Sequence, residues 1–310
     1  MIKKDFTVVS DYDGLSLKGL VYEPENSPKG IVQLVHGMCE YKKRYEPFME
    51  FLAQNGYIAA CYDQRGHGDT VEKDTDFGWM NDCRGKAIVE DCVKVTKWLK
   101  STYPDLPVTL LGHSMGSMVV RCYLQKHETE IEKLIVSGSP SQNPVCSLGI
   151  ALNKSIGFFK GERHRSATMK KLTTGGDKNF PGEGKNAWLT RDKGVVDAYN
   201  ADEKCNYTFT CNGFENLLKL MKNTYDQKRY AVKNPALPIF FVAGSDDPVI
   251  VSPEKWKNAQ DFLRKVGYRE VSGKLYHGFR HEVLNEIGKE RVYADILDFI
   301  ELDKKISQKH

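Results

Sequence analysis

Short apolar runs alternate with helix-length segments along most of this chain. We predict buried strands in five such runs, because they are brief, rich in aliphatic residues and bounded by polar or glycine-containing stretches. The runs are residues 31–35, 57–62, 108–111, 133–137 and 238–243. Between two of them, the segment 86–102 repeats its apolar residues at helical spacing. Strands that alternate with helices in this way indicate a mostly parallel sheet covered by helices on both faces.

The two ends of the chain depart from this pattern. Residues 5–9 and 15–22 flank Asp13-Gly14, a dipeptide that favours a tight turn, so we expect an antiparallel pair of strands there. At the other end, apolar residues recur at helical spacing. We therefore expect a long final helix from about residue 282.

The alternation of strands and helices stops between residues 140 and 232, where no strand is apparent and glycine-containing pairs interrupt the chain. We expect a core formed by residues 1–139 and 233–310, with 140–232 inserted as a helical cap.

Two neighbouring segments of this expected cap have alternative interpretations. The apolar stretch 145–159 is either a lid over a pocket or ordinary packing against the sheet, because periodicity does not separate core from pocket lining. Its candidate lid residues are Leu148, Ile150, Leu152, Ile156 and Phe159. The basic run 160–171 is either a solvated face or a contact for anionic lipid or a phosphate head group. Its candidate residues are Arg163, Arg165, Lys170 and Lys171.

Composition excludes several classes of protein. Hydrophobic residues make up 40% and charged residues 28% of the chain, as in ordinary globular proteins. The net charge of +4 is spread along the sequence, so no nucleic-acid partner is expected. No window approaches the roughly 18 consecutive apolar residues of a membrane span, and no apolar signal-peptide core follows the first lysines. Eight scattered cysteines form no CxxC pair. We therefore expect a cytoplasmic protein with reduced thiols.

The strongest chemical signal is Gly112-His113-Ser114-Met115-Gly116, a GxSxG sequence between an apolar strand and a helical run. A sharp strand-to-helix turn needs small residues on either side of the serine, whose hydroxyl then projects above the sheet. We expect Ser114 to be a nucleophile, with a purely structural turn as the alternative.

A serine hydroxyl is a weak nucleophile, so it needs a nearby base that a carboxylate orients. In this kind of site the acid and then the histidine follow the serine along the chain. The predicted strand 238–243 leads into a loop with two acids, Asp246 and Asp247. We favour Asp247, because the neighbouring Pro248 helps to fix the loop, and keep Asp246 as the alternative.

The histidine is expected after the next strand, 271–275, where His277 and His281 are the candidates. We favour His281, because the glycine-containing loop before it can bring it towards the serine. His277 lies nearer the strand and is expected to be a solvated side chain. Position 285 is Asn, so the sequence that begins at His281 lacks the second histidine of a zinc motif. No metal and no cofactor are expected.

Acyl transfer also needs hydrogen-bond donors for the oxyanion that develops during attack. The backbone amide of Met115, directly after the serine, is one expected donor. We assign the second to the amide of Met38, in the loop after strand 31–35, where Gly37 lets the backbone come close. The methionine side chains are then expected to line the acyl pocket.

Two other segments are expected to be structural. His36 fits a buried, hydrogen-bonded histidine. The glycine-rich loop 63–68 is not followed by Gly-Lys-Ser/Thr, which argues against a phosphate loop.

With these residues in place, nearly the whole chain resembles the monoglyceride lipase and lysophospholipase family of α/β-hydrolases, which includes the serine aminopeptidase-like hydrolases. The resemblance rests on segments 36–40, 44–45, 63–68, 112–116, 244–249, 276–281, 188–192 and on Val196, Tyr199, Asp202 and Glu286. It implies the α/β-hydrolase fold, the choice of Asp247 and His281, and a mobile, partly apolar cap over an acyl pocket.

These observations predict a serine carboxylic ester hydrolase that works through an acyl-enzyme. Monoacylglycerol or lysophospholipid is the expected substrate, and transient contact of the cap with a membrane surface would follow. A general short-chain carboxylesterase and a non-catalytic binding protein of the same fold are the alternatives. A dehalogenase or epoxide hydrolase is disfavoured, because those enzymes carry Asp where this chain has Ser114.

Overall fold

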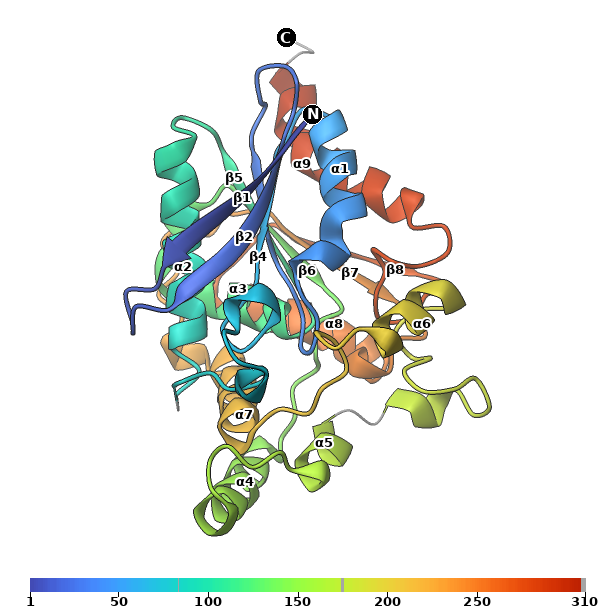
Figure 1. Ribbon diagram of the computed structural model, residues 1–310. Helices are drawn as coiled ribbons and strands as arrows, with labels where there is room; N and C mark the ends of the chain where they lie inside the picture. The colour runs from blue at the N-terminus through green and yellow to red at the C-terminus, as the bar shows by residue number, and fades with distance from the viewer. Residues whose placement is uncertain (83, 174–175, 308–310) are drawn as a thin grey trace.

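The computed structural model describes residues 1–82, 84–173 and 176–307 (Figure 1). Within them, one sheet of eight strands has the order β1-β2-β4-β3-β5-β6-β7-β8. β2 pairs antiparallel with β1 and with β4, and all other neighbours are parallel. The prediction of a mostly parallel sheet is confirmed. The strands are β1 (Ile2–Val9), β2 (Ser16–Glu23), β3 (Ile31–Val35), β4 (Ile58–Tyr62), β5 (Val108–His113), β6 (Lys133–Ser137), β7 (Ile239–Gly244) and β8 (Val271–Tyr276).

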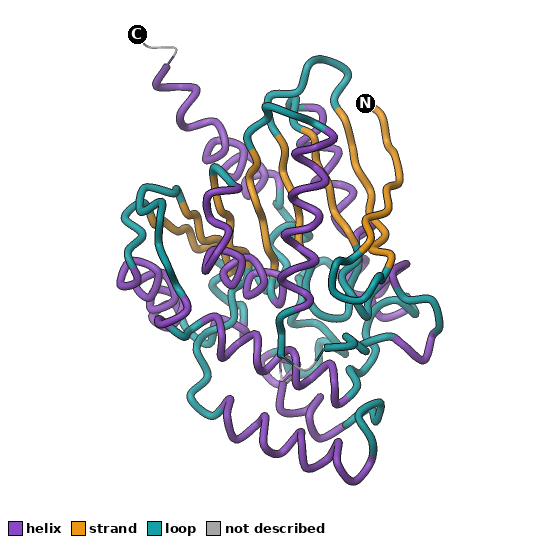
Figure 2. The backbone as a smooth tube through the Cα atoms, turned by 90° about the vertical axis from the view of Figure 1, so that its left-hand side faces the viewer, coloured by secondary structure: helices purple, strands orange, loops and turns teal. Residues whose placement is uncertain are grey.

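Helices cover both faces of this sheet (Figures 1 and 2). α2, α3 and α8 contribute to the hydrophobic core on one face, and α1 and α9 to the core on the other. Every residue of β3, β4, β5 and β6 is buried, which explains why these strands are largely apolar. The helices of these layers are α1 (Glu46–Gln54), α2 (Ala87–Thr102), α3 (Met115–His127), α8 (Pro253–Val266) and α9 (Glu290–Ser307).

The helices of segment 140–232 gather beyond one end of the sheet (Figure 1). They are α4 (Cys146–Lys160), α5 (Ala167–Thr173), α6 (Lys193–Ala201) and α7 (Cys211–Thr224). α4 packs on α7, and α7 packs on α3 of the sheet layer. The described residues of this segment contain no strand, only an isolated bridge between Arg165 and Thr210.

The expected start of the final helix near residue 282 is wrong, because α9 begins at Glu290. Residues 281–289 form turns instead. The buried Glu286 carboxylate accepts hydrogen bonds from the backbone amides of Arg280, at 3.0 Å, and Ile287, at 2.9 Å. Side chains that bind nearby backbone amides compete with helical hydrogen bonds, so they hold this stretch as a loop.

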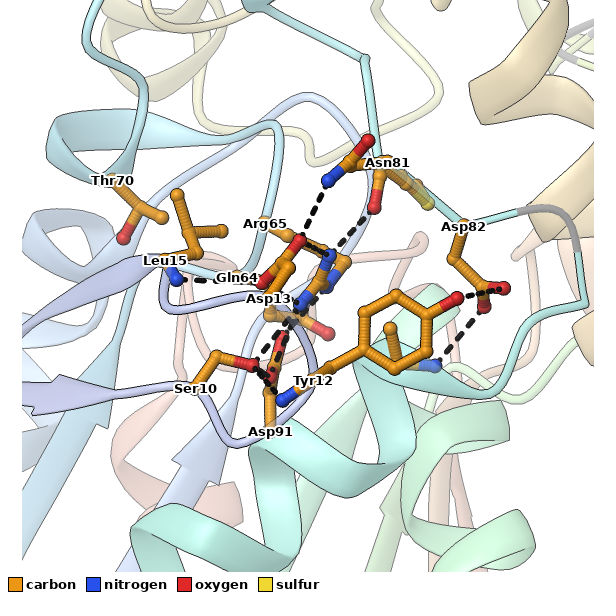
Figure 3. Close-up of polar contacts among 12 residues, drawn as sticks. Ser10, Tyr12, Asp13, Leu15, Gln64, Arg65, Thr70, Asn81, Asp82 and Asp91 are labelled. Carbon is orange, nitrogen blue, oxygen red and sulfur yellow. Dashed lines mark hydrogen bonds and ion pairs between the residues drawn. The ribbon is translucent and has the colours of Figure 1, made fainter.

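The glycine-rich loop 63–68, which was expected to be structural, is held by ion pairs. Arg65 is 1% exposed, and its guanidinium contacts Asp91 at 2.7 Å and Asp13 at 3.0 Å (Figure 3). It also donates to the carbonyl oxygen of Met80 at 2.7 Å. These contacts tie the β1–β2 connection to α2 and to the loop before it, which is a structural role.

Candidate active site

Ser114 lies at a strained turn between β5 and α3. Its φ of 52° and ψ of −116° are unusual for a residue with a side chain. The flanking glycines are needed for close approach: a Cβ on Gly112 would lie 2.4 Å from the carbonyl oxygen of Gly116. One on Gly116 would lie 2.1 Å from the carbonyl oxygen of Val35. The sequence GxSxG therefore forms the predicted sharp turn.

Asp247 and His281 come together from the loops after β7 and β8. His281 Nδ1 lies 2.9 Å from Asp247 Oδ2 and is hydrogen-bonded to it. Asp247 Oδ1 accepts a further hydrogen bond from the amide of Val249 at 2.8 Å, which holds the carboxylate in place. His281 also lines the same cavity as Ser114.

The alternative residues occupy different surroundings. Asp246 is exposed and accepts a hydrogen bond from the hydroxyl of Ser245 at 2.7 Å. His277 is exposed. Neither residue lines the cavity that contains Ser114.

The charge state of His281 is determined by opposing effects. Burial disfavours the imidazolium, but the negative charge of Asp247 and the hydrogen bond to it outweigh burial and raise the pKa of His281 above 6.5. His113, whose ring centroid lies 4.6 Å from that of His281, has its pKa lowered to about 4 by burial and by the neighbouring His281. His113 is therefore neutral at pH 7.

Loop 36–40 approaches the turn at Ser114 closely. A Cβ on Gly37 would lie 3.1 Å from the Cβ of Ser114 and 2.6 Å from Glu40 Oε1. Met38 and Met115 both line the cavity. Among the described residues, no hydrogen bond from either backbone amide is formed, so both donors are available to a bound group.

His36 is buried behind this loop, as expected. Its Nε2 accepts a hydrogen bond from the amide of Gln64 at 2.9 Å. Burial lowers the pKa of His36 to about 4. The residue is neutral and structural.

An ion network that the sequence reasoning missed joins loop 36–40 to the histidine loop. Arg44 donates to both carboxylate oxygens of Glu282 at 2.7 Å and to Glu40 at 2.9 Å. Glu40 also accepts hydrogen bonds from the amide of Gly37 at 2.5 Å and from the hydroxyl of Tyr45 at 2.9 Å. Burial would raise the pKa of Glu282, but Arg44 lowers it to about 2. The four-residue spacing of Glu40 and Arg44 could have indicated the ion pair between them. No local pattern in the sequence indicated that Glu282 would join it.

The segment before α6 lies along the histidine loop. The amide of Glu282 donates to the carbonyl oxygen of Leu189 at 2.7 Å, and the ring of Trp188 lies 5.0 Å from that of His281. Arg191 forms an ion pair with Glu286 at 3.0 Å. Residues of segment 140–232 therefore help to hold His281.

The cavity at Ser114 has a volume of about 580 Å³. Apolar side chains of α4 and α7 form part of its wall. They include Leu148, Leu152, Phe214, Leu217, Leu218 and Met221. Of the other candidate lid residues, Ile150 and Ile156 pack against the hydrophobic core, and Phe159 is 82% exposed. Part of segment 145–159 therefore lines the cavity, and part of it packs against the core.

Within residues 1–82, 84–173 and 176–307, no group of three or more His, Cys, Asp or Glu side chains could hold a metal ion. In the same ranges, no helix is long and apolar enough to cross a membrane.

The fold and the site define an α/β-hydrolase, and comparison with known proteins gives the family. Residues 26–288 match the serine aminopeptidase S33 family. A monoacylglycerol lipase of Mycolicibacterium smegmatis is 27% identical over 284 residues, which cover 90% of this chain and 91% of that protein. The phospholipase YtpA of Bacillus subtilis is 26% identical over 272 residues, or 86% of this chain and 93% of that protein.

Solved structures agree with this assignment. A thermostable carboxyl esterase from Bacillus coagulans, in complex with glycerol, has a TM-score of 0.87 at 27% identity, covering 97% of this chain and 98% of the esterase. This chain therefore belongs to the serine aminopeptidase S33 family of α/β-hydrolases. The comparisons confirm the prediction that this chain is a carboxylic ester hydrolase.

Proposed function

We propose that this protein hydrolyses carboxylic esters through an acyl-enzyme formed on Ser114, with His281 as general base and Asp247 as the residue that orients it. The observation that carries the proposal is the 2.9 Å hydrogen bond between His281 and Asp247 at the cavity that Ser114 also lines. Such an arrangement can activate a hydroxyl that is otherwise a weak nucleophile.

The proposed reaction has two halves. Ser114 Oγ attacks the ester carbonyl carbon while His281 Nε2 accepts the hydroxyl proton. The amides of Met38 and Met115 donate hydrogen bonds to the oxyanion. The bond to the alcohol oxygen then breaks, and His281 protonates the departing alcohol. Water attacks the acyl-enzyme in the same way and releases the carboxylic acid and free Ser114.

Monoacylglycerol or lysophospholipid is the substrate class that we favour. The apolar side chains of α4 and α7 suit a fatty acyl chain, and relatives of this chain are a monoacylglycerol lipase and a phospholipase. A general short-chain carboxylesterase is the second candidate, because the Bacillus coagulans enzyme at 27% identity is a carboxyl esterase.

A panel of esters that varies acyl length and head group separately tests this choice. We expect rates to rise with acyl length, with Ser114→Ala inactive on every ester. Highest rates on acetyl or butyryl esters would instead favour the short-chain carboxylesterase. If the wild-type protein hydrolyses no ester in the panel, the result would favour a non-catalytic binding protein.

We also propose that segment 140–232 acts as a cap that contacts membrane surfaces transiently. Phe158 and Phe159 at the end of α4 are 84% and 82% exposed, and the exposed Lys160 follows them. Aromatic side chains beside a cation suit the interface of an anionic lipid layer. The described cysteines are free, which supports a cytoplasmic location.

A further inference from the structure

An aromatic side chain of segment 140–232 lies against the proposed general base. The ring centroids of Trp188 and His281 are 5.0 Å apart, and the two ring planes are tilted by 37°. Trp188 is half-buried and lines the same cavity as Ser114 and His281. The acyl-enzyme reaction proposed above assigns no role to this indole.

Backbone contacts hold Trp188 in this position. The amide of His281 donates to the carbonyl oxygen of Trp188 at 3.4 Å. The guanidinium of Arg280 donates to the carbonyl oxygen of Ala187 at 2.7 Å. The indole also packs closely against the backbone at Gly176, because a Cβ there would lie 2.5 Å from Trp188 Cγ. The ring is therefore held beside the histidine as a built part of the site.

The charges around His281 come from carboxylates on separate loops. Burial lowers the pKa of His281, and the charges of Asp247, Glu282 and Glu40 raise it. Glu282 and Glu40 are both paired with Arg44, which offsets part of their charge. Asp247 contacts the edge of the imidazole at Nδ1 and leaves the face of the ring to other side chains.

Two aromatic rings contact His281 within the part of the chain that the structure describes, and they offer different surroundings to a cation. The ring centroid of His113 lies 4.6 Å away, and this residue is neutral because burial and the charge of His281 lower its pKa to about 4. The face of an indole attracts a cation best among aromatic side chains, up to about 6 Å from the ring centroid. Trp188 meets this condition at 5.0 Å.

We propose that Trp188 stabilises the positively charged form of His281, which arises each time the histidine accepts a proton from Ser114 or from the attacking water. The attraction between a cation and an aromatic face is strongest where water is excluded, and His281 is 2% exposed. Trp188 acts on the reaction through His281 and exchanges no proton, so it is a positioning residue. This inference rests on the proposed ester hydrolysis and adds a residue of segment 140–232 to it.

The pH dependence of hydrolysis of a soluble ester, p-nitrophenyl acetate, tests this role. Trp188→Leu removes the aromatic face and leaves an apolar side chain. We expect it to lower kcat about ten-fold on the plateau above the midpoint, because the charged form of His281 loses its stabilisation during the reaction. The midpoint of kcat/KM should also move down by about one pH unit, since His281 of the free enzyme then holds its proton less tightly.

Two further variants separate this effect from a general loss of structure. Trp188→Phe keeps an aromatic face and should retain about a third of the wild-type kcat or more. Trp79→Leu is the matched control, because Trp79 is also half-buried, lies 4.3 Å from the guanidinium of Arg163, and does not line the cavity. It should change kcat less than about two-fold and leave the midpoint where it is in the wild type.

Fluorinated tryptophan tests the ring itself with little change in its size. Fluorine withdraws electron density from the face of an indole, which weakens the attraction for a cation. Growth on fluorotryptophan replaces Trp79, Trp98, Trp188 and Trp256 together. The midpoint of kcat/KM should then fall by about half a pH unit in the wild type. It should not move in Trp188→Phe, which keeps the other three tryptophans.

The inference is overturned by an unchanged midpoint in Trp188→Leu or in the fluorinated wild type, or by a change confined to KM. Each of these results would leave ester hydrolysis at Ser114 intact. Failure of the proposed function looks different, because the wild type would then hydrolyse the ester at no pH, or Ser114→Ala would keep its activity.

Discussion

Asp247 and His281 differ from their neighbouring alternatives in their surroundings. Asp247 and His281 are 3% and 2% exposed and hydrogen-bonded to each other, whereas Asp246 and His277 are exposed. The sequence supported the choice through Pro248 and a glycine-containing loop, which are features of the chain near each residue. The environment of each side chain depends on segments far away in the sequence.

We predict that Asp247→Asn and His281→Ala each lower kcat/KM by about three orders of magnitude or more, because in the proposed mechanism one acid and one base serve the serine. Asp246→Asn and His277→Ala are the matched controls and should change kcat/KM less than about three-fold, since both residues are exposed, neither lines the cavity, and surface substitutions cost little stability. Steady-state kinetics on one soluble ester compares all four. A severe loss at Asp246 or His277 would reverse the corresponding assignment.

The raised pKa of His281 predicts the pH dependence. In the proposed mechanism His281 acts as a base only when it is neutral, so kcat/KM should rise with pH, with a midpoint above 6.5. Asp247→Asn removes the charge that raises the pKa, and burial then lowers it, so the midpoint of the residual activity should move to lower pH. A pH–rate profile of both proteins measures this. An unchanged midpoint in Asp247→Asn would contradict the role of Asp247.

At the scale of elements, strands and helices were predictable where local pattern and fold agree. The runs 31–35 and 133–137 match β3 and β6, because strands buried on both faces are mostly apolar. The loop 281–289 was not predictable, since Val283 and Leu284 continue the helical pattern. Glu286 holds the chain in turns instead, by accepting hydrogen bonds from the nearby amides of Arg280 and Ile287 and from the distant amide of Arg191. The network of Arg44, Glu40 and Glu282 depends on the same long-range folding.

Arg44 joins two elements that carry the site, so its removal should affect both. We predict that Arg44→Met lowers the free energy of unfolding by about 3–5 kcal/mol, because two buried carboxylates lose their partner. The exposed Lys43→Met is the control and should change it by less than about 0.5 kcal/mol. Urea unfolding followed by fluorescence measures both. If Arg44→Met unfolds at the wild-type urea concentration, the network does not stabilise the site.

At the scale of the whole molecule, segment 140–232 contributes both to the cavity and to the surface. Leu148 and Leu172 line the cavity yet are 71% and 64% exposed, so the cavity opens towards solvent between α4 and α5. The end of α4 carries Phe158 and Phe159, which are exposed and do not line the cavity. Composition could not separate the two uses, because a pocket wall and a membrane-facing surface are both apolar.

We predict that Phe158→Ser with Phe159→Ser lowers hydrolysis of an ester embedded in anionic vesicles at least five-fold, since burial of two aromatic side chains in the lipid interface is lost; roughly 1 kcal/mol per ring suffices for this. Hydrolysis of a soluble short-chain ester should be unchanged. Val9→Ser, on the exposed edge strand β1 and 55% exposed, is the control. Equal loss on both esters, or no loss on vesicles, would rule out a membrane contact at the end of α4.

The central claim, covalent catalysis by Ser114, is tested most directly by mapping the adduct of a fluorophosphonate probe. Peptide mass spectrometry should find one phosphonylated residue, Ser114. Ester hydrolysis should fall in proportion to the labelling of this residue. Ser114→Ala should remain folded and take up no probe. Full ester hydrolysis by Ser114→Ala, or labelling at another residue that tracks the loss of activity, would contradict the account.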